Sequence, residues 1–136
     1  MPKAEKSKPQ HPAREHWKEE PDEHDYPAAA AYLSLLMPQD QVIAVVGALK
    51  EASIEHQKAK DLLRASRLAL LATNNAHVAA DLEKVKQGER LSPVLLVRGQ
   101  MAADVALTVA DGYHRVCASY HLDENADIPC RIVTAP

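Results

Sequence analysis

The sequence predicts a small α/β (α+β) domain built on a mixed sheet. Apolar residues make up 46% of the 136 residues and charged residues 26%, a balance typical of a chain that folds around one core. From residue 54 onward, segments with helical spacing alternate with short apolar runs of strand length. Phe is absent and Trp occurs once, so the core must consist mainly of Leu, Val, Ile and Ala.

Two helices are expected before the sheet. Residues 28–37 read as a short helix that stops at Pro38, because proline breaks the helical hydrogen-bond pattern. Residues 39–52 place Val42 and Leu49 on one face at helical spacing. We interpret this pair as a packing layer, and it is also a candidate face for a homodimer.

The core is expected over residues 54–133 in the order β-α-α-β-β-α-β. Asn74 or Asn75 is a suitable helix N-cap, and Gly88 stands where the same helix should end. The continuous apolar run 94–97 is typical of a strand that is covered on both faces. The expected elements are a strand at 54–58, helices at 60–70 and 75–87, strands at 93–98 and 105–110, a helix from 114 or 115 to 122, and a strand at 128–133.

Residues 1–27 are expected to form a disordered, charged, Pro-rich tail. They contain five of the nine prolines and twelve charged residues, but no Leu, Ile or Val. Such a composition buries too little apolar surface to offset the entropy cost of ordering. Trp17 is the exception, because an isolated Trp in a polar arm is suited to anchoring. The tail is therefore a candidate for recruiting a protein or DNA partner.

Composition also excludes several classes of protein. The net charge of -3 argues against nucleic-acid binding by bulk electrostatics. Two cysteines, Cys117 and Cys130, do not make a disulfide framework. The longest apolar-rich stretch, residues 28–37, is about half as long as a membrane span. We therefore expect a cytoplasmic protein with no membrane partner.

The segment that carries most chemistry is Asp111-Gly112-Tyr113-His114-Arg115, where a strand should end and a helix begin. Glycine permits a sharp turn and a close approach to a ligand. The first amides of a helix lack internal partners and attract anions. Arg115 can hold phosphate through paired hydrogen bonds, and His114 can donate another or transfer a proton near neutral pH. The pattern predicts a phosphate-binding turn.

Residues 82–98, followed by residues 110–115, resemble the ParB/sulfiredoxin superfamily. Its members share a helix ending in Gly, a Pro-led strand, a second strand and a Gly-x-x-Arg turn that opens a helix. The resemblance covers residues 54–133 and implies a compact α/β domain that binds a nucleotide, with the phosphates at the turn. It also implies that His77 and Lys84, seven residues apart on the preceding helix, face the nucleotide.

Branches of this superfamily differ at the turn. Sulfiredoxins bind ATP with a Gly-Cys-His-Arg turn whose Cys is the catalytic thiol, and Tyr113 takes that place here. ParB proteins bind CTP with a Gly-Glu-Arg-Arg turn and carry a DNA-binding helix-turn-helix afterwards, which we do not expect in a chain that ends at Pro136. Free-serine kinases use an Asp-Gly-His-x-Arg-like turn, with the Asp close to the metal and the phosphates. Residues 111–115 are similar to that turn.

The resemblance therefore implies a ligand that is a nucleotide or another phosphorylated small molecule. Gly112, Tyr113, His114 and Arg115 would bind its phosphates together with Lys84 and His77. Asp111 would hold Mg²⁺ or orient an attacking hydroxyl, which makes Asp111 and His114 the candidate catalytic residues for phosphoryl transfer or hydrolysis.

Three alternatives remain. The chain could be a non-enzymatic regulatory module in which the tail binds a protein or DNA partner, or a ParB-like nuclease. A zinc site is the third, because His114, Cys117 and His121 fall on one stripe of a helix, with Cys130 on the next strand.

Overall fold

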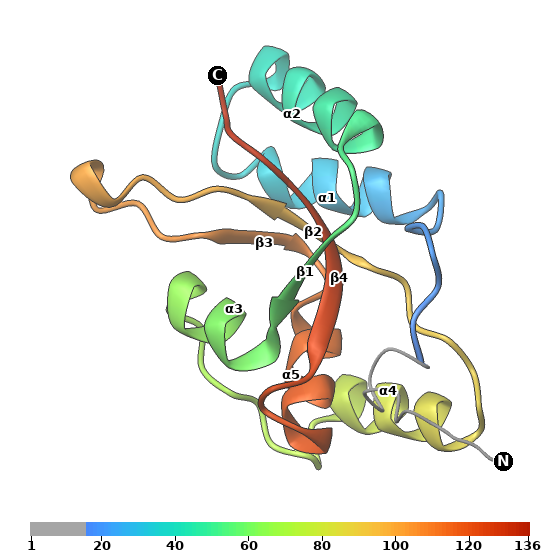
Figure 1. The fold of residues 1–136 in the computed structure, drawn as a ribbon. Helices are drawn as coiled ribbons and strands as arrows, with labels where there is room; N and C mark the ends of the chain where they lie inside the picture. Colours follow the sequence, from blue (N-terminus) through green and yellow to red (C-terminus); the bar gives the residue numbers. More distant parts are fainter. Residues whose placement is uncertain (1–15) are drawn as a thin grey trace, which may run out of the picture.

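The computed structural model describes residues 16–136 and confirms a mixed α/β architecture (Figure 1). A four-stranded sheet lies between two groups of helices. None of the helices within residues 16–136 has the length and apolar character needed to cross a bilayer. The elements are α1 (Asp25–Leu33), α2 (Gln39–Glu51), β1 (Glu55–Lys58), α3 (Ala59–Ser66), α4 (Ala76–Lys86), β2 (Val94–Val97), the 3-10 helix η2 (Met101–Ala103), β3 (Thr108–Asp111), α5 (Tyr113–Leu122) and β4 (Asp127–Val133).

The strand order in the sheet is β1-β4-β2-β3. β4 runs parallel to β2 and antiparallel to β1, and β2 runs antiparallel to β3. Val94 and Leu96 of β2 belong to one core, whereas Leu95 and Val97 belong to the other, and all four are buried. This alternation confirms that β2 is covered on both faces.

Different helices form the two cores. α1 and α2 pack on one face of the sheet through residues such as Leu33 and Leu49. α3, α4 and α5 cover the opposite face with Leu62, Val78 and Val116. The helical pair expected before the sheet is therefore a packing layer of the same domain.

The predicted order β-α-α-β-β-α-β is confirmed, although several ends shift. α3 ends at Ser66 instead of residue 70, because Arg67 takes a φ of 59° and leaves the helix. β3 begins at Thr108 instead of residue 105, because residues 98–107 form an arm that carries η2. Of the two predicted N-caps, Asn74 and Asn75, it is Asn75 that caps α4, and its side chain accepts hydrogen bonds from two backbone amides of the first turn.

The predicted tail boundary is wrong for residues 16–27. Trp17 is only 5% exposed and belongs to the core formed with α3, α4 and α5. Two backbone hydrogen bonds, of 2.5 and 2.8 Å, join its neighbours to Leu91. α1 then begins at Asp25. Trp17, Pro21 and Tyr26 are all buried, so this segment contributes apolar surface to the cores and packs on the domain. Residues 1–15 of the predicted tail lie outside the described residues.

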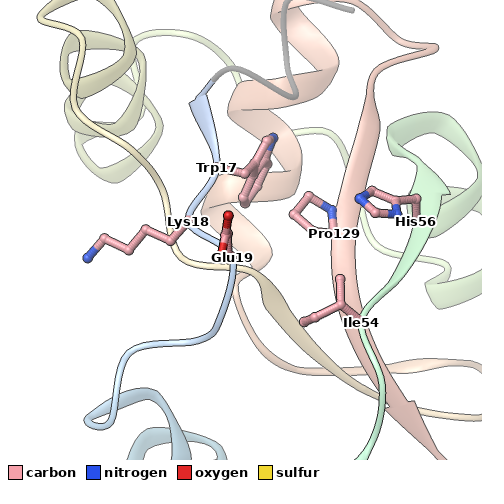
Figure 2. Close-up of a pocket in the computed structure, with 6 residues that line it drawn as sticks. All are labelled: Trp17, Lys18, Glu19, Ile54, His56 and Pro129. Atoms are coloured by element: carbon pink, nitrogen blue, oxygen red, sulfur yellow. The ribbon is translucent and has the colours of Figure 1, made fainter.

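Trp17 packs close to Pro129 of β4 (Figure 2). Together with Ile54 and His56 they line a hollow of about 280 Å³. The three residues that follow Trp17, which are Lys18, Glu19 and Glu20, are exposed. The indole ring is therefore the side chain through which the start of this segment is held.

Replacing Trp17 with Ala should lower the free energy of unfolding by about 3–5 kcal/mol, the usual cost of removing a buried aromatic ring. The matched change Tyr32→Ala removes a ring that is 45% exposed on α1, and should cost less than about 1 kcal/mol. Urea unfolding followed by circular dichroism gives both values. Equal losses in the two variants would show that Trp17 does not belong to the core.

Candidate functional site

The turn between β3 and α5 has the geometry expected of a ligand-binding turn. β3 ends at Asp111, Gly112 has a φ of 115°, and α5 begins at Tyr113. A Cβ atom on Gly112 would lie 2.4 Å from Cγ1 of Val94 and 2.8 Å from Nη2 of Arg115, so only glycine fits. Gly112 is the N-cap of α5 and makes no side-chain capping hydrogen bond, so within residues 16–136 the first-turn amides are left without a side-chain cap.

This helix end opens into a polar hollow of about 220 Å³, which we call the α4–α5 hollow. All seven residues that the sequence analysis assigns to the site line it, and Ala80 and Asp81 complete the lining. The seven are His77, Lys84, Asp111, Gly112, Tyr113, His114 and Arg115.

His77 and His114 meet across the hollow. Their ring centroids are 4.6 Å apart, one ring coming from α4 and the other from α5. Burial lowers the pKa of His114, and the neighbouring His77 adds to the shift. His114 is therefore neutral at pH 7, where it can donate one hydrogen bond and accept another.

The side-chain hydroxyl of Tyr113 is already engaged in a hydrogen bond within the protein. Its hydroxyl donates a hydrogen bond of 2.5 Å to the carbonyl of Ala69, in the segment that leads to α4. The contribution of Tyr113 to anion binding would therefore come from its backbone amide.

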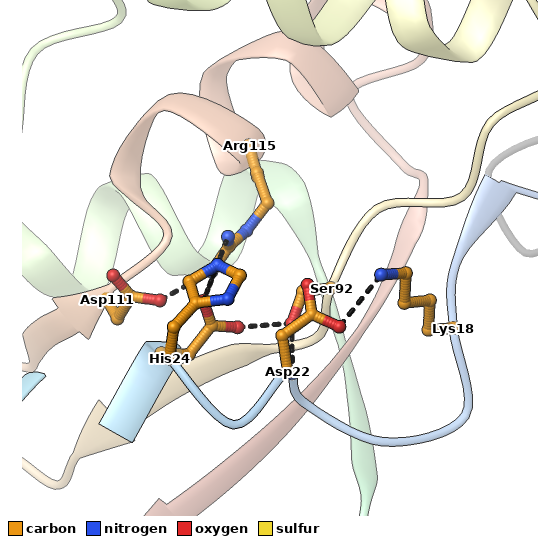
Figure 3. A network of polar contacts seen from close by, with 7 residues as sticks. Lys18, Asp22, His24, Ser92, Asp111 and Arg115 are labelled. Carbon is orange, nitrogen blue, oxygen red and sulfur yellow. Dashed lines mark hydrogen bonds and ion pairs between the residues drawn. The ribbon is translucent and has the colours of Figure 1, made fainter. Parts of the chain in front are cut away.

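Arg115 is engaged in an internal ion-pair network (Figure 3). Its Nη2 lies 2.9 Å from Oδ2 of Asp111, and its Nη1 lies 3.9 Å from Oδ1 of Asp25. Asp25 is buried and accepts a hydrogen bond from the Ser92 hydroxyl, whose oxygen accepts the Asp22 amide at 2.9 Å. The guanidinium is thus shared between two carboxylates before any ligand binds.

Two carboxyl groups of the α4–α5 hollow have raised pKa values. Burial raises the pKa of Asp111, although Arg115 opposes the shift. Burial also raises the pKa of Asp81, on α4. Mg²⁺ in proteins is usually held by one or two carboxylates together with phosphate oxygens. Asp111 and Asp81 fit that donor set.

Two members of this network, Asp22 and Asp25, also form a group of potential metal ligands with His24. One ligand atom each of Asp22, His24 and Asp25 lies within 4.8 Å of the others. Cations already balance both carboxylates, because Lys18 lies 2.8 Å from Asp22 and Arg115 lies 3.9 Å from Asp25. The Lys18 hydrogen bond also lowers the pKa of Asp22. These contacts identify the group as an ion-pair network.

The zinc alternative is not supported. Nε2 of His121 lies 2.7 Å from the carbonyl of Leu71, and Cys117 is buried. Burial raises the pKa of Cys130 to about 12, which disfavours the thiolate that binds zinc. Within residues 16–136, the one group of three or more candidate metal ligands is the cluster of Asp22 and its neighbours. The helix stripe and β4 thus do not bring the four predicted ligands together.

Asp81, Asp25 and Ser92 are not among the site residues predicted from the sequence. Asp81 had a signal, because it lies four residues after His77 and three before Lys84, on the same helix face. Asp25 and Ser92 had none. They are 67 positions apart in the chain, and only the fold brings them together.

Comparisons with protein-family models, curated proteins and solved structures find no match for this chain. The resemblance to the ParB/sulfiredoxin superfamily stays a prediction. The chemistry of the α4–α5 hollow rests on its own residues.

Gly112→Ala should lower the free energy of unfolding by at least about 2 kcal/mol, because the variant combines an unfavourable positive φ with two close contacts. Gly47→Ala is the matched control. Gly47 is exposed within α2, and an added Cβ would meet nothing within 4 Å. It should therefore stabilise the protein by about 0.5–1 kcal/mol. Urea unfolding measures both, and a Gly112→Ala variant as stable as wild type would contradict the turn geometry.

Asp81→Asn should stabilise the protein at pH 7. The raised pKa of Asp81 means that the folded state holds this proton more tightly than the unfolded state does. Wild-type stability therefore falls as the pH rises from about 4, the ordinary pKa of Asp, through the raised pKa. The side-chain amide of the Asp81→Asn variant carries no charge that burial would desolvate, so the stability of the variant does not fall over this pH range for that reason.

Thermal unfolding at pH 7 and pH 4 tests this expectation. The gain in Tm of Asp81→Asn should be larger at pH 7 than at pH 4. Glu89→Gln, at an exposed position after α4, should change Tm little at either pH. A gain that is equal at both pH values would argue against burial as the cause.

Proposed function

We propose that the α4–α5 hollow binds the phosphoryl group of a nucleotide or of another phosphorylated small molecule. The observation that carries the proposal is the uncapped end of α5, which opens into a hollow that also contains Lys84. Backbone amides at a helix start and a nearby ammonium group are a recurring combination for phosphate. His114 adds a neutral hydrogen-bond donor on the same side.

The size of the hollow favours the phosphoryl end of a ligand. Pockets that enclose a whole drug-sized molecule usually measure about 300–1,000 Å³. The α4–α5 hollow measures about 220 Å³, and its lining is mainly polar. We therefore expect the phosphoryl group to lie inside and the rest of the ligand to lie across the exposed surface of α4.

The charges of the hollow favour binding with Mg²⁺. The positive charges of Lys84 and Arg115 are offset by the carboxylates of Asp81 and Asp111. A bare phosphate would meet two carboxylates as well as two cations. Asp111 and Asp81 would hold Mg²⁺ together with phosphate oxygens, and the ion would neutralise the added negative charge.

Arg115 supports the site by holding the β3–α5 turn in place. Its ion pair with Asp111 spans the turn, so it holds the turn in the conformation that presents the α5 amides. Arg115→Ala would leave Asp111 and the buried Asp25 without their cation, and would reduce stability as well as binding. Lys84 is exposed, so its substitution tests binding with little effect on folding. The resemblance to a nucleotide-binding superfamily supports the same assignment.

Calorimetric titration with ATP, ADP, CTP and GTP, each with and without Mg²⁺, tests the proposal. We expect saturable binding of at least one nucleotide, tighter with Mg²⁺. Lys84→Gln should weaken that binding about tenfold or more, the equivalent of one charged hydrogen bond. Lys86→Gln is the control, because Lys86 is exposed on α4 but does not line the hollow.

The titration would contradict the proposal in two ways. One is the absence of binding heat with every nucleotide under both conditions. The other is equal affinity in wild type and Lys84→Gln, which would place the nucleotide elsewhere.

A further inference from the structure

A second and larger hollow lies between α3 and the arm of residues 98–107, which reaches out from the sheet above α3 (Figure 1). We call it the arm groove. Its volume is about 390 Å³, inside the range of about 300–1,000 Å³ that is usual for small-molecule sites. It shares no lining residue with the α4–α5 hollow. Its apolar lining includes Leu62, Ala65, Leu96, Val105, Leu107 and Ile132.

The arm is fixed to α3 at two points. The Leu107 amide donates a hydrogen bond of 3.0 Å to the carbonyl of Ala65, and Arg67 lies 2.8 Å from the carboxylate of Asp104. Arg67 and Asp104 have φ values of 59° and 57°, and they are the two non-glycine residues with positive φ within residues 16–136. Both residues of this ion pair therefore have an unfavourable backbone conformation. Such conformations persist where the surrounding structure imposes them, which indicates that the arm is held in place against α3.

The base of the arm is equally constrained. A Cβ atom on Gly99 would lie 2.6 Å from the carbonyl oxygen of Val105, so the two sides of the arm approach each other as only glycine permits. The Gln100 amide donates to the same carbonyl at 2.8 Å. The groove is therefore a preformed cavity, which lowers the entropy cost of binding.

Among residues 16–136, one cation at the groove has no carboxylate partner. Arg67 is paired with Asp104, and Asp61 is paired with Arg64 at 3.3 Å. Arg98 is exposed, and within the described part of the chain its side chain has one hydrogen bond, from Nε to the Thr134 hydroxyl at 3.3 Å. A guanidinium at an apolar groove is suited to a single anionic group, which it can hold through two parallel hydrogen bonds.

We propose that the arm groove binds a small amphipathic carboxylate. Its apolar chain would lie against Ala65, Val105 and Leu107, which line the groove and keep part of their surface exposed, and its carboxylate would contact Arg98. The site does not depend on the function proposed for the α4–α5 hollow, because the two share no residue.

Titration of the full chain with octanoate, followed by ¹H–¹⁵N NMR, tests the proposal. We expect saturable shifts that centre on the amides of Gly99 and Leu107. 1-Octanol has the same chain length without the charge, and should bind about tenfold more weakly, the equivalent of one charged hydrogen bond. Arg98→Gln should bring octanoate to the affinity of 1-octanol, whereas Arg90→Gln, at another exposed arginine, should leave it unchanged.

A second pair of variants tests the position of the chain. Ala65 is exposed on α3 and lines the groove, so Ala65→Phe should fill it without preventing folding, and should weaken octanoate at least about tenfold. Ala44→Phe adds the same ring to an exposed position on α2 and should bind octanoate as wild type does. Shifts that do not saturate, or an unchanged affinity in both Ala65→Phe and Arg98→Gln, would overturn the proposal.

Discussion

The buried carboxylate of Asp25 joins three parts of the chain that lie far apart in sequence: the start of α1, Ser92 and residues 111–115. It opens α1, accepts a hydrogen bond from Ser92 just before β2, and lies 3.9 Å from Arg115 of α5. Arg115 in turn reaches back to Asp111 at the end of β3. An unpaired buried charge costs several kcal/mol, so each member of this network constrains the position of the others. The geometry of the β3–α5 turn depends on this arrangement.

Because of this network, the cationic groups around the α4–α5 hollow have different roles. With its guanidinium shared between two carboxylates, Arg115 holds the turn, whereas Lys84 and the first amides of α5 remain available to a ligand. The charged forms of Asp81 and Asp111 carry a desolvation cost, which raises the pKa of each group. Such a cost is typical of binding sites, where groups are placed for a ligand at the expense of stability.

The α4–α5 hollow is lined mainly by polar groups and the arm groove mainly by apolar side chains, because they form at different places in the fold. The α4–α5 hollow lies where a helix start meets a polar helix face, so backbone amides and charged side chains line it. The arm groove lies where the β2–β3 connection leaves the sheet, so partly buried apolar side chains at the edge of the core, such as Leu107 and Ile132, line it. Each hollow is lined by a glycine at which an added Cβ would clash with neighbouring atoms. This residue is Gly112 in the α4–α5 hollow and Gly99 in the arm groove.

The sequence by itself determined the local features: the order of helices and strands from residue 54, an asparagine cap at residue 74 or 75, the doubly covered strand β2 and the glycine turn at residue 112. These follow from periodicity, capping and backbone freedom, which act over a few residues. Only the tertiary structure decided that Trp17 belongs to the core, that Asp25 and Ser92 complete the Arg115 network, and that residues 98–107 form an arm over a groove. Those features depend on contacts between distant segments, and such contacts leave no spacing signal in the sequence.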